Sequence, residues 1–302
     1  MRTLLLRLVC IPWVVMIGSV FWSGLVLAAP AINVLVSEPT GIHQETANSL
    51  SQALRREGWK ITVYTPERPI ASGSDLTIAI GTKALEAALA QSGRPVLALL
   101  VPRLIYEHLA SGQRQISALY LDQPLSRQLQ LLGMALPGLK KVGAPLGPSN
   151  QGLQAAQQSA AKDSGIQVES AVIGQGSDLY AALTDLAEGS QAFVLLLDPL
   201  VAQRSTLQNL FLHTYRLRKP VLAYSAPLAQ SGALLALYAT PAQLSEEAAD
   251  WIRESWIGGG FRLGAPRYPR RFTIAINHTV ARSLDIALSS KDALTHQLEA
   301  MQ

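Results

Sequence analysis

The sequence is poor in cysteine and in charge. Its single cysteine, Cys10, lies in the first 29 residues, so a chain that loses this segment has no thiol for a disulfide or for thiolate catalysis. Only 15% of the 302 residues are charged and 49% are hydrophobic, a composition that supports a large core and argues against disorder. Without Arg2 and Arg7, the only charged residues of that segment, 23 basic residues face 21 acidic ones. This near balance indicates that nucleic acid is not a partner.

The common cofactor motifs are also missing. No Gly-x-x-x-x-Gly-Lys-Ser/Thr run occurs, and no Gly-x-Gly-x-x-Gly pattern opens a helix, so a nucleotide site is not expected. The five histidines are scattered and lack the His-x-x-x-His spacing that many zinc sites use. The sequence therefore predicts no cofactor and no metal site.

Residues 1–29 have the order of a secretory signal. Two arginines come first, an apolar run follows over residues 8–24, and small residues end the segment. This order predicts cleavage after Ala28, hence a signal peptide over residues 1–28 and a mature chain in the periplasm. The alternative is an uncleaved membrane anchor, because residues 8–29 are long enough to span a bilayer.

Residues 75–102 predict one βαβ unit. Residues 76–80 are an apolar run rich in β-branched side chains, which suits a strand that is buried on both faces. Gly81-Thr82 then breaks the run and starts an Ala/Leu-rich helix, and residues 96–101 form the next strand. Ligands of open parallel sheets bind beyond the carboxyl ends of the strands. Gly81-Thr82 and Val101-Pro102 are therefore the first places to look for a site.

Two successive runs of strand–helix units are expected along the chain. They meet near residues 121–124, where Asp122-Gln123-Pro124 interrupts the pattern. We therefore expect an α/β protein with two doubly wound parallel-sheet lobes joined by a hinge. The expected division assigns residues 29–121 and about 239–270 to lobe I, and residues 122–238 and about 271–302 to lobe II. The flexible stretch Gly258-Gly259-Gly260 is the best candidate for a late segment that crosses between the lobes.

Several polar residues follow expected strands. Ser149 lies in Gly147-Pro-Ser-Asn-Gln-Gly152, which resembles a nucleophile elbow with one residue too many. The alternative is that Ser149 or Asn150 caps the next helix, whose first amides would bind an acidic group. Asp198 either caps a turn or accepts a hydrogen bond from a ligand. Because strand ends share one sheet edge, Thr82, Ser149, Asn150 and Asp198 are expected to face one cleft from opposite lobes.

Four further segments carry a family resemblance through their order in the chain. They are Asp75-Leu-Thr-Ile-Ala-Ile-Gly-Thr-Lys-Ala84, Arg94-Pro95-Val96, Leu136-Pro-Gly-Leu-Lys-Lys-Val-Gly143 and Phe272-Thr-Ile-Ala-Ile-Asn277. In this order the chain resembles the periplasmic substrate-binding proteins of ABC transporters, in the family that includes tryptophan- and tyrosine-binding members. The chain departs from that family at residues 144–148, where members usually have a Tyr-Asn pair. An aromatic amino acid is therefore not carried over as the ligand.

The resemblance implies a type I periplasmic-binding-protein fold whose cleft loops contact a small ligand. By position these contacts are Ser37, Glu38, Gly81, Thr82, Ser149, Asn150, Asp198, Ser225 and Ala226. The expected function is capture of a small molecule, such as an amino acid or a related compound, by a monomer that is not an enzyme. Delivery to the membrane permease of an ABC importer would follow. Two alternatives stay open, namely a ligand-sensing or accessory protein that partners a membrane receptor, and a hydrolase that uses Ser149.

Overall fold

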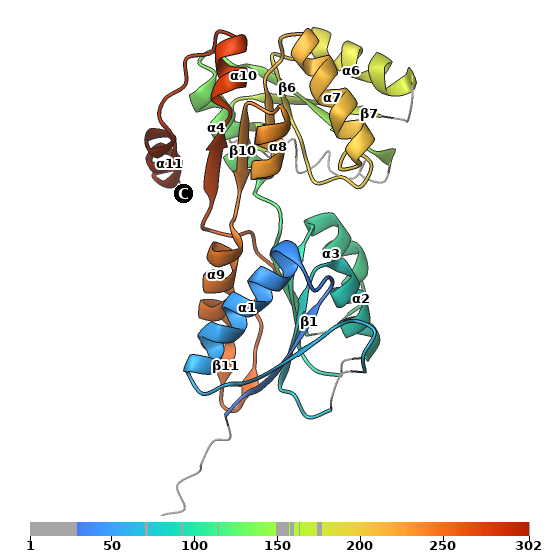
Figure 1. Cartoon of the computed structure of the whole chain (residues 1–302), viewed down its shortest axis with the longest axis vertical. Helices are drawn as coiled ribbons and strands as arrows, with labels where there is room; N and C mark the ends of the chain where they lie inside the picture. Colours follow the sequence, from blue (N-terminus) through green and yellow to red (C-terminus); the bar gives the residue numbers. More distant parts are fainter. Residues whose placement is uncertain are drawn as a thin grey trace, which may run out of the picture.

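The structure is a computed structural model, in which two lobes are stacked along the long axis (Figure 1). It describes residues 29–69, 72–91, 93–113, 115–148, 157, 160–162, 164–173 and 177–301. The elements of the lower lobe, lobe I, are β1 (Ala31–Val36), α1 (Gly41–Arg56), β2 (Lys60–Tyr64), β3 (Leu76–Ile80), α2 (Thr82–Gln91), β4 (Val96–Val101), α3 (Arg103–Leu109), β5 (Ile116–Tyr120), α9 (Pro241–Ser255), β11 (Trp256–Ile257) and β12 (Gly260–Phe261). The elements of the upper lobe, lobe II, are α4 (Leu125–Ala135), β6 (Lys141–Leu146), β7 (Gln167–Val172), α6 (Ser177–Gly189), β8 (Ala192–Val194), α7 (Arg204–Arg216), β9 (Val221–Ala223), α8 (Ala226–Ser231), β10 (Leu235–Tyr238), β13 (Thr273–Ile276), α10 (His278–Ser283) and α11 (Lys291–Glu299).

Lobe I contains a parallel sheet in the order β2-β1-β3-β4-β5. Its strands alternate their side chains between two cores, as period-two geometry requires. Ile78 and Ile80 pack with α1 and α9 on one face, whereas Ala79 packs with α2 and α3 on the other. All five residues of β3 are buried, so the predicted strand with two covered faces is confirmed.

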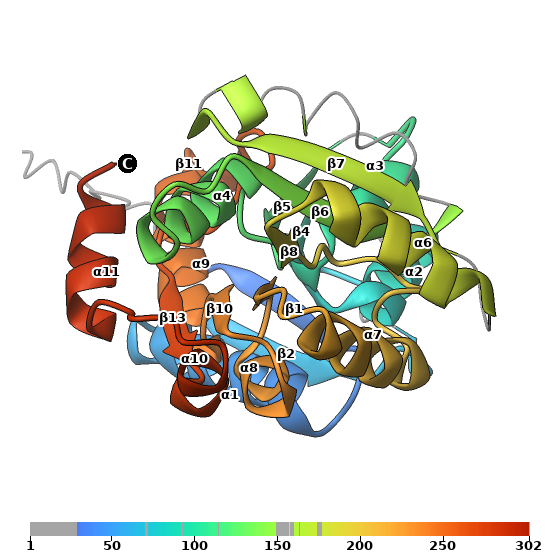
Figure 2. The ribbon, with the colours of Figure 1, turned by 90° about the horizontal axis from the view of Figure 1, so that it is seen from above.

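Lobe II contains a sheet in the order β13-β10-β9-β8-β6-β7. Helices α4 and α11 cover one face, and α6, α7 and α8 cover the other, as the view from above shows (Figure 2). The predicted fold class is thus confirmed, but β13 runs antiparallel to β10. The chain enters β13 from lobe I, so this strand leads away from the cleft while the parallel strands end there.

Three segments cross between the lobes, at residues 121–124, 239–240 and 269–272. Each contains or adjoins a proline, namely Pro124, Pro241 and Pro269. The ring of proline fixes its own φ angle near −65°, which limits the rotation that the neighbouring backbone can take up. The connection between the lobes is therefore short and locally stiff.

The prediction that Gly258-Gly259-Gly260 crosses between the lobes is wrong. Gly258 and Gly259 have φ angles of +61° and +82° and form the turn of the hairpin β11–β12, a conformation that favours glycine. The hairpin stays in lobe I because its aromatic rings pack there. The ring centroids of Trp256 and Phe261 are 4.8 Å apart, and both rings also contact Trp59.

Some of the predictions fall on residues that the structure does not describe. The proposed signal segment, apart from Ala29, is one of them, and Ser149 and Asn150 are the others. Among the helices that the structure does describe, none is both long and apolar enough to cross a membrane.

Candidate functional site

Ser37 and Gly81, two predicted ligand contacts, are tied into the fold of lobe I. The Ser37 hydroxyl accepts a hydrogen bond of 2.9 Å from the Ala84 backbone N–H and so satisfies the first turn of α2. Gly81 has a φ angle of +91°, and a Cβ atom there would lie 2.5 Å from Ser37 Oγ and 2.7 Å from His43 Nε2. Only glycine fits this turn, so Gly81 has a structural reason to be there.

Four further predicted ligand contacts lie at the start of a helix or are exposed to solvent. Thr82 begins α2, and Ser225 immediately precedes Ala226, the first residue of α8. The side chains of Thr82 and Ser225 are partly exposed, and in the described part of the chain neither makes a side-chain hydrogen bond. Glu38 is exposed and pairs with Lys83 at 3.6 Å. Ligand contact by these residues stays a prediction.

Asp198 is buried, and backbone N–H groups surround its carboxylate. One oxygen accepts from Gly147 at 2.8 Å, and the other accepts from Leu200 at 2.8 Å and Val201 at 3.0 Å. A Cβ atom on Gly147 would lie 2.7 Å from the Asp198 carboxylate, so glycine permits this close approach. These bonds favour the capping role over the alternative of binding a ligand.

A cavity of about 370 Å³ lies between the lobes, next to the first and third crossing segments. This volume is within the range of small-molecule sites. Its apolar lining residues are Leu104, Pro124, Leu125, Ala160, Leu195, Leu196 and Leu197. Its polar or aromatic lining residues are Arg103, Asp122, Gln123, Ser126, Gln128, Gln157, Tyr224 and Tyr268. None of the predicted contacts in the described part of the chain lines this cavity.

Arg103 and Asp122 form the charged wall of the cavity. Each lies two residues after the carboxyl end of a lobe I strand, Arg103 after β4 and Asp122 after β5. The Arg103 backbone N–H donates to the Asp122 carboxylate at 2.6 Å, while its side chain donates to Glu107 at 2.7 Å and to the Tyr268 hydroxyl at 2.8 Å. Within the described residues, Nη2 of Arg103 makes no hydrogen bond. A planar anion could bind there.

A bulge in β4 places Arg103. Leu100 is buried and has a φ angle of +56°, and the pairing of β4 with β5 shifts register between Leu99 and Val101. A bulge adds one residue to its strand and turns the residues that follow. Side chains other than glycine adopt such a φ angle at a free-energy cost. The strained residue thus lies three positions before the arginine of the cavity wall.

Burial changes the acid–base behaviour of the cavity side chains. It raises the pKa of the Asp122 carboxyl to about 6, although hydrogen bonds from backbone N–H groups act in the opposite direction. Burial also raises the pKa of Tyr224 to about 12, so this hydroxyl remains a donor at neutral pH. Above pH 6 the cavity lining therefore offers the Arg103 cation, the Asp122 carboxylate and the neutral Tyr224 phenol.

Three glutamines beside the cavity each have a buried polar atom without a hydrogen bond among the described residues. These atoms are Nε2 of Gln123, Oε1 of Gln128 and Nε2 of Gln157. For Gln123 the orientation is set by Arg127, which donates to its Oε1, and for Gln128 by its own donation to the Gln123 carbonyl. Buried polar atoms normally have partners, so these three side chains are placed to form hydrogen bonds with a molecule in the cavity.

The signal for part of this site was present in the sequence. The end of the strand at Val101-Pro102 was predicted as a place to look, and Asp122 follows the next strand at the same edge. Tyr268 lies immediately before the third crossing segment, more than a hundred residues away, and no local pattern marks it. In the described part of the chain, no group of three or more His, Cys, Asp or Glu is placed to hold a metal ion.

Comparison with known proteins places this geometry in context. Residues 59–296 match a family model described as ABC transporter substrate binding protein. Similar solved structures include a conserved domain protein from Vibrio cholerae, at 19% identity over 89% of this chain and 97% of that chain, with a TM-score of 0.61. Another is the ABC domain in complex with L-Trp from Streptococcus pneumoniae, at 16% identity over 88% and 98%, with a TM-score of 0.60.

A third similar structure is the ligand-free, open form of a substrate-binding protein with adhesive properties from Clostridium difficile. It is 16% identical over 88% of this chain and 97% of that chain, with a TM-score of 0.68. No curated protein sequence matches the chain. At these identities the solved structures show a shared fold.

Proposed function

Because the chain belongs to the family of ABC transporter substrate-binding proteins, we propose that it captures a small zwitterion, an amino acid or a related compound, in the cavity between its lobes. The predicted family resemblance is thereby confirmed, and the chain is a binding protein and not an enzyme. The hydrolase alternative for Ser149 is set aside on this ground.

The charged wall of the cavity carries the proposal. Nη2 of Arg103 would donate to a carboxylate of the ligand, and Asp122, ionised above pH 6, would accept from an ammonium group. Leu195, Leu196 and Leu197 line the cavity from lobe II and suit an apolar part of the ligand. A compound with both charges and a hydrocarbon part satisfies all three features.

The cavity site and the sequence-predicted contacts belong to one cleft in this proposal. The hydroxyls of Thr82 and Ser225 lie at helix starts of opposite lobes and make no hydrogen bond within the described part of the chain. They would contact the ligand or its water shell when the lobes close. Ser149 and Asn150 lie outside the described residues, and their contact with the ligand is kept as part of the proposal. Asp198 would support this edge of lobe II through the backbone.

The proposal includes an address and a partner. A leader removed after Ala28 would place the protein in the periplasm, where it would deliver the compound to the membrane permease of an ABC importer. Cells that lack the protein are then expected to take up the compound more slowly. Normal uptake with loss of a response to the compound would instead favour a ligand-sensing or accessory protein that partners a membrane receptor.

The identity of the ligand is tested by mass spectrometry of small molecules released from protein that was purified without unfolding. We expect one bound compound that carries both an amine and a carboxylate. A tightly bound sugar or other uncharged compound would contradict the assignment of Arg103 and Asp122. The measurement needs no prior choice of ligand.

A further inference from the structure

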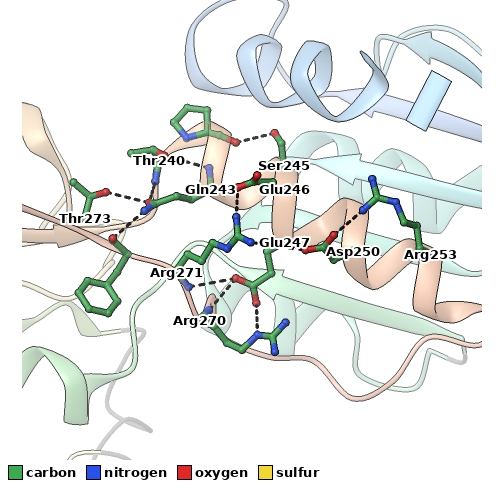
Figure 3. Close-up of polar contacts among 12 residues, drawn as sticks. Thr240, Gln243, Ser245, Glu246, Glu247, Asp250, Arg253, Arg270, Arg271 and Thr273 are labelled. Carbon is green, nitrogen blue, oxygen red and sulfur yellow. Dashed lines mark hydrogen bonds and ion pairs between the residues drawn. The ribbon is translucent and has the colours of Figure 1, made fainter. Parts of the chain in front are cut away.

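The third crossing segment is held from both lobes by buried charged side chains. From lobe II, Arg127 Nη1 donates to the Pro269 carbonyl at 2.8 Å. From lobe I, Glu247 on α9 accepts from the backbone N–H of Arg270 at 2.9 Å and of Arg271 at 3.4 Å (Figure 3). We call Arg127, Glu247 and the three residues between them, 269–271, the bracket. A rotation of one lobe against the other must stretch one side of it.

The two side chains of the bracket are buried deeply enough for these bonds to matter. Arg127 is 8% exposed and Glu247 only 2% exposed. A charge that is buried to this extent is strongly destabilising unless it keeps its partners. Exposed ion pairs at the same place, such as Arg271 with Glu246, are solvated and contribute little. The two buried side chains, Arg127 and Glu247, therefore determine where the segment lies.

The bracket is joined to the other two crossing segments. Arg127 Nη1 also donates to Gln123 Oε1, at 2.5 Å, in the first crossing segment. Gln243 on α9 accepts from the Thr240 backbone N–H at 2.9 Å, in the second segment, and donates to the Phe272 carbonyl at 2.9 Å, in the third (Figure 3). These bonds connect all three crossing segments.

The cavity lies next to the bracket. Its lining includes Gln123, which is bonded to Arg127, and Tyr268, which precedes Pro269 in the chain. A ligand that contacts these two side chains would press on the first and third crossing segments at once. The bracket therefore connects residues that the ligand would contact with the segment about which the lobes would move.

Glu247 also has a long contact with Arg267, just outside the bracket. Glu247 Oε1 and Arg267 Nε are buried, make no hydrogen bond among the described residues, and lie 3.9 Å apart. The Arg267 guanidinium instead lies over the Trp251 ring, 4.0 Å from its centroid. Arg267 is hydrogen-bonded through its backbone to Ala118 and Tyr120 of β5, so this contact lies within lobe I. The same Glu247 oxygen lies 3.4 Å from Arg270 Nε, a further contact with the third crossing segment.

We propose that Glu247 and Arg127 are positioning residues for ligand capture, which set the angle between the lobes in the ligand-free protein. Loss of either side chain frees the third crossing segment from one lobe and lets the lobes adopt a wider range of angles. The importance of this angle for capture rests on the proposed function. The angle itself is a property of the protein without ligand, and it can be measured separately.

The test is a distance measurement between spin labels on the two lobes of the ligand-free full chain. Labels at Glu86→Cys on α2 and Glu188→Cys on α6, both exposed positions, are introduced in a Cys10→Ser background. Pulsed electron paramagnetic resonance then reports the distribution of distances. We expect a broader and shifted distribution for Glu247→Met than for the parent protein.

The control is Glu246→Met, the same substitution one position earlier on α9, at a side chain that is 66% exposed. It removes an ion pair to the same segment but leaves the bracket intact, so it should match the parent protein. Glu247→Gln keeps one acceptor for the Arg270 N–H and should give an intermediate width. Arg127→Met breaks the bracket from the other lobe and should also broaden the distribution. Distributions for the folded variants that equal that of Glu246→Met would overturn the proposal, whatever the cavity binds.

Discussion

At the scale of single residues, the structure separates polar side chains that serve the fold from those that face a cavity. Asp198 and Arg103 both follow a strand at the cleft edge and look alike in the sequence. The Asp198 carboxylate is used by three backbone N–H groups, whereas Arg103 keeps one nitrogen without a partner among the described residues. Replacing Asp198 should therefore lower the stability of the protein, whereas replacing Arg103 should lower its affinity for the ligand.

Asp198→Ala is expected to lower the free energy of unfolding by about 2–5 kcal/mol, because it leaves buried N–H groups without acceptors. Denaturant unfolding measures this loss. Asp185→Ala, at an exposed position on α6, is the control and should change stability by less than about 0.5 kcal/mol. If Asp198→Ala unfolds like the control and loses only ligand affinity, Asp198 is a ligand contact and not a cap.

Asp122 should make stability depend on pH in a defined direction. The pKa of its carboxyl is raised to about 6 in the folded protein, well above its ordinary value, so the folded state holds the proton more tightly than the unfolded state. Stability must then fall as pH rises from about 4 to about 6 and level off above that. Asp122→Asn cannot lose a proton and should escape this fall.

The difference in unfolding free energy between Asp122→Asn and the parent protein isolates this group. We expect it to move by about 2–3 kcal/mol in favour of the variant between pH 4 and pH 7. Parallel denaturant titrations at the two pH values give the number, and other titrating groups cancel. A difference that does not change with pH, or that moves toward the parent protein, would show that the pKa of Asp122 is not raised in the folded protein.

At the scale of elements, the hairpin β11–β12 stabilises lobe I. Phe261 is buried against Trp59 and Trp256, so Phe261→Ala removes the centre of an aromatic cluster. We expect this change to lower the free energy of unfolding by about 2–4 kcal/mol. Denaturant unfolding monitored by tryptophan fluorescence measures the loss. Ile257→Ala on the same hairpin, where the side chain is 52% exposed, should cost less than about 0.5 kcal/mol. Equal effects of the two variants would mean that the hairpin does not pack on the lobe.

The elements also show what the sequence could and could not predict. Apolar runs such as residues 76–80 predict buried strands because burial on both faces requires side chains of one kind. Three consecutive glycines indicate a flexible break but do not distinguish a crossing segment from a tight hairpin, since glycine permits both a flexible linker and the positive φ angles of a turn. The direction of β13 depends on where the chain re-enters lobe II. That is a property of the assembled fold and not of the strand.

The same limit applies to the site. A strand end is visible in the sequence, so the neighbourhood of Arg103 and Asp122 could be predicted. The bulge at Leu100 and the arrival of Tyr268 beside Arg103 depend on contacts between distant segments, and no local pattern encodes them. Ser37 and Gly81 were predicted as ligand contacts from their positions alone. In the structure the Ser37 hydrogen bond and the Gly81 backbone conformation build the turn that leads into α2.

At the scale of the whole molecule, two lobes with separate cores are joined by three short segments, and a cavity lies beside the first and third of these segments. This arrangement lets a ligand touch both lobes and the hinge at the same time. A ligand held in this way is bound tightly only when the lobes are correctly oriented. The central claim is that Arg103 binds an acidic group of that ligand.

Calorimetry with the compound that the mass spectrometry identifies, on Arg103→Gln, tests this claim most directly. Removing one partner of a buried charged ligand group should cost roughly 2–5 kcal/mol, a loss of about 30-fold or more in affinity. Lys83→Gln removes an exposed positive charge from the end of lobe I that faces the cleft and should bind like the parent protein. Circular dichroism confirms that both variants are folded. An affinity of Arg103→Gln equal to that of Lys83→Gln would contradict the account.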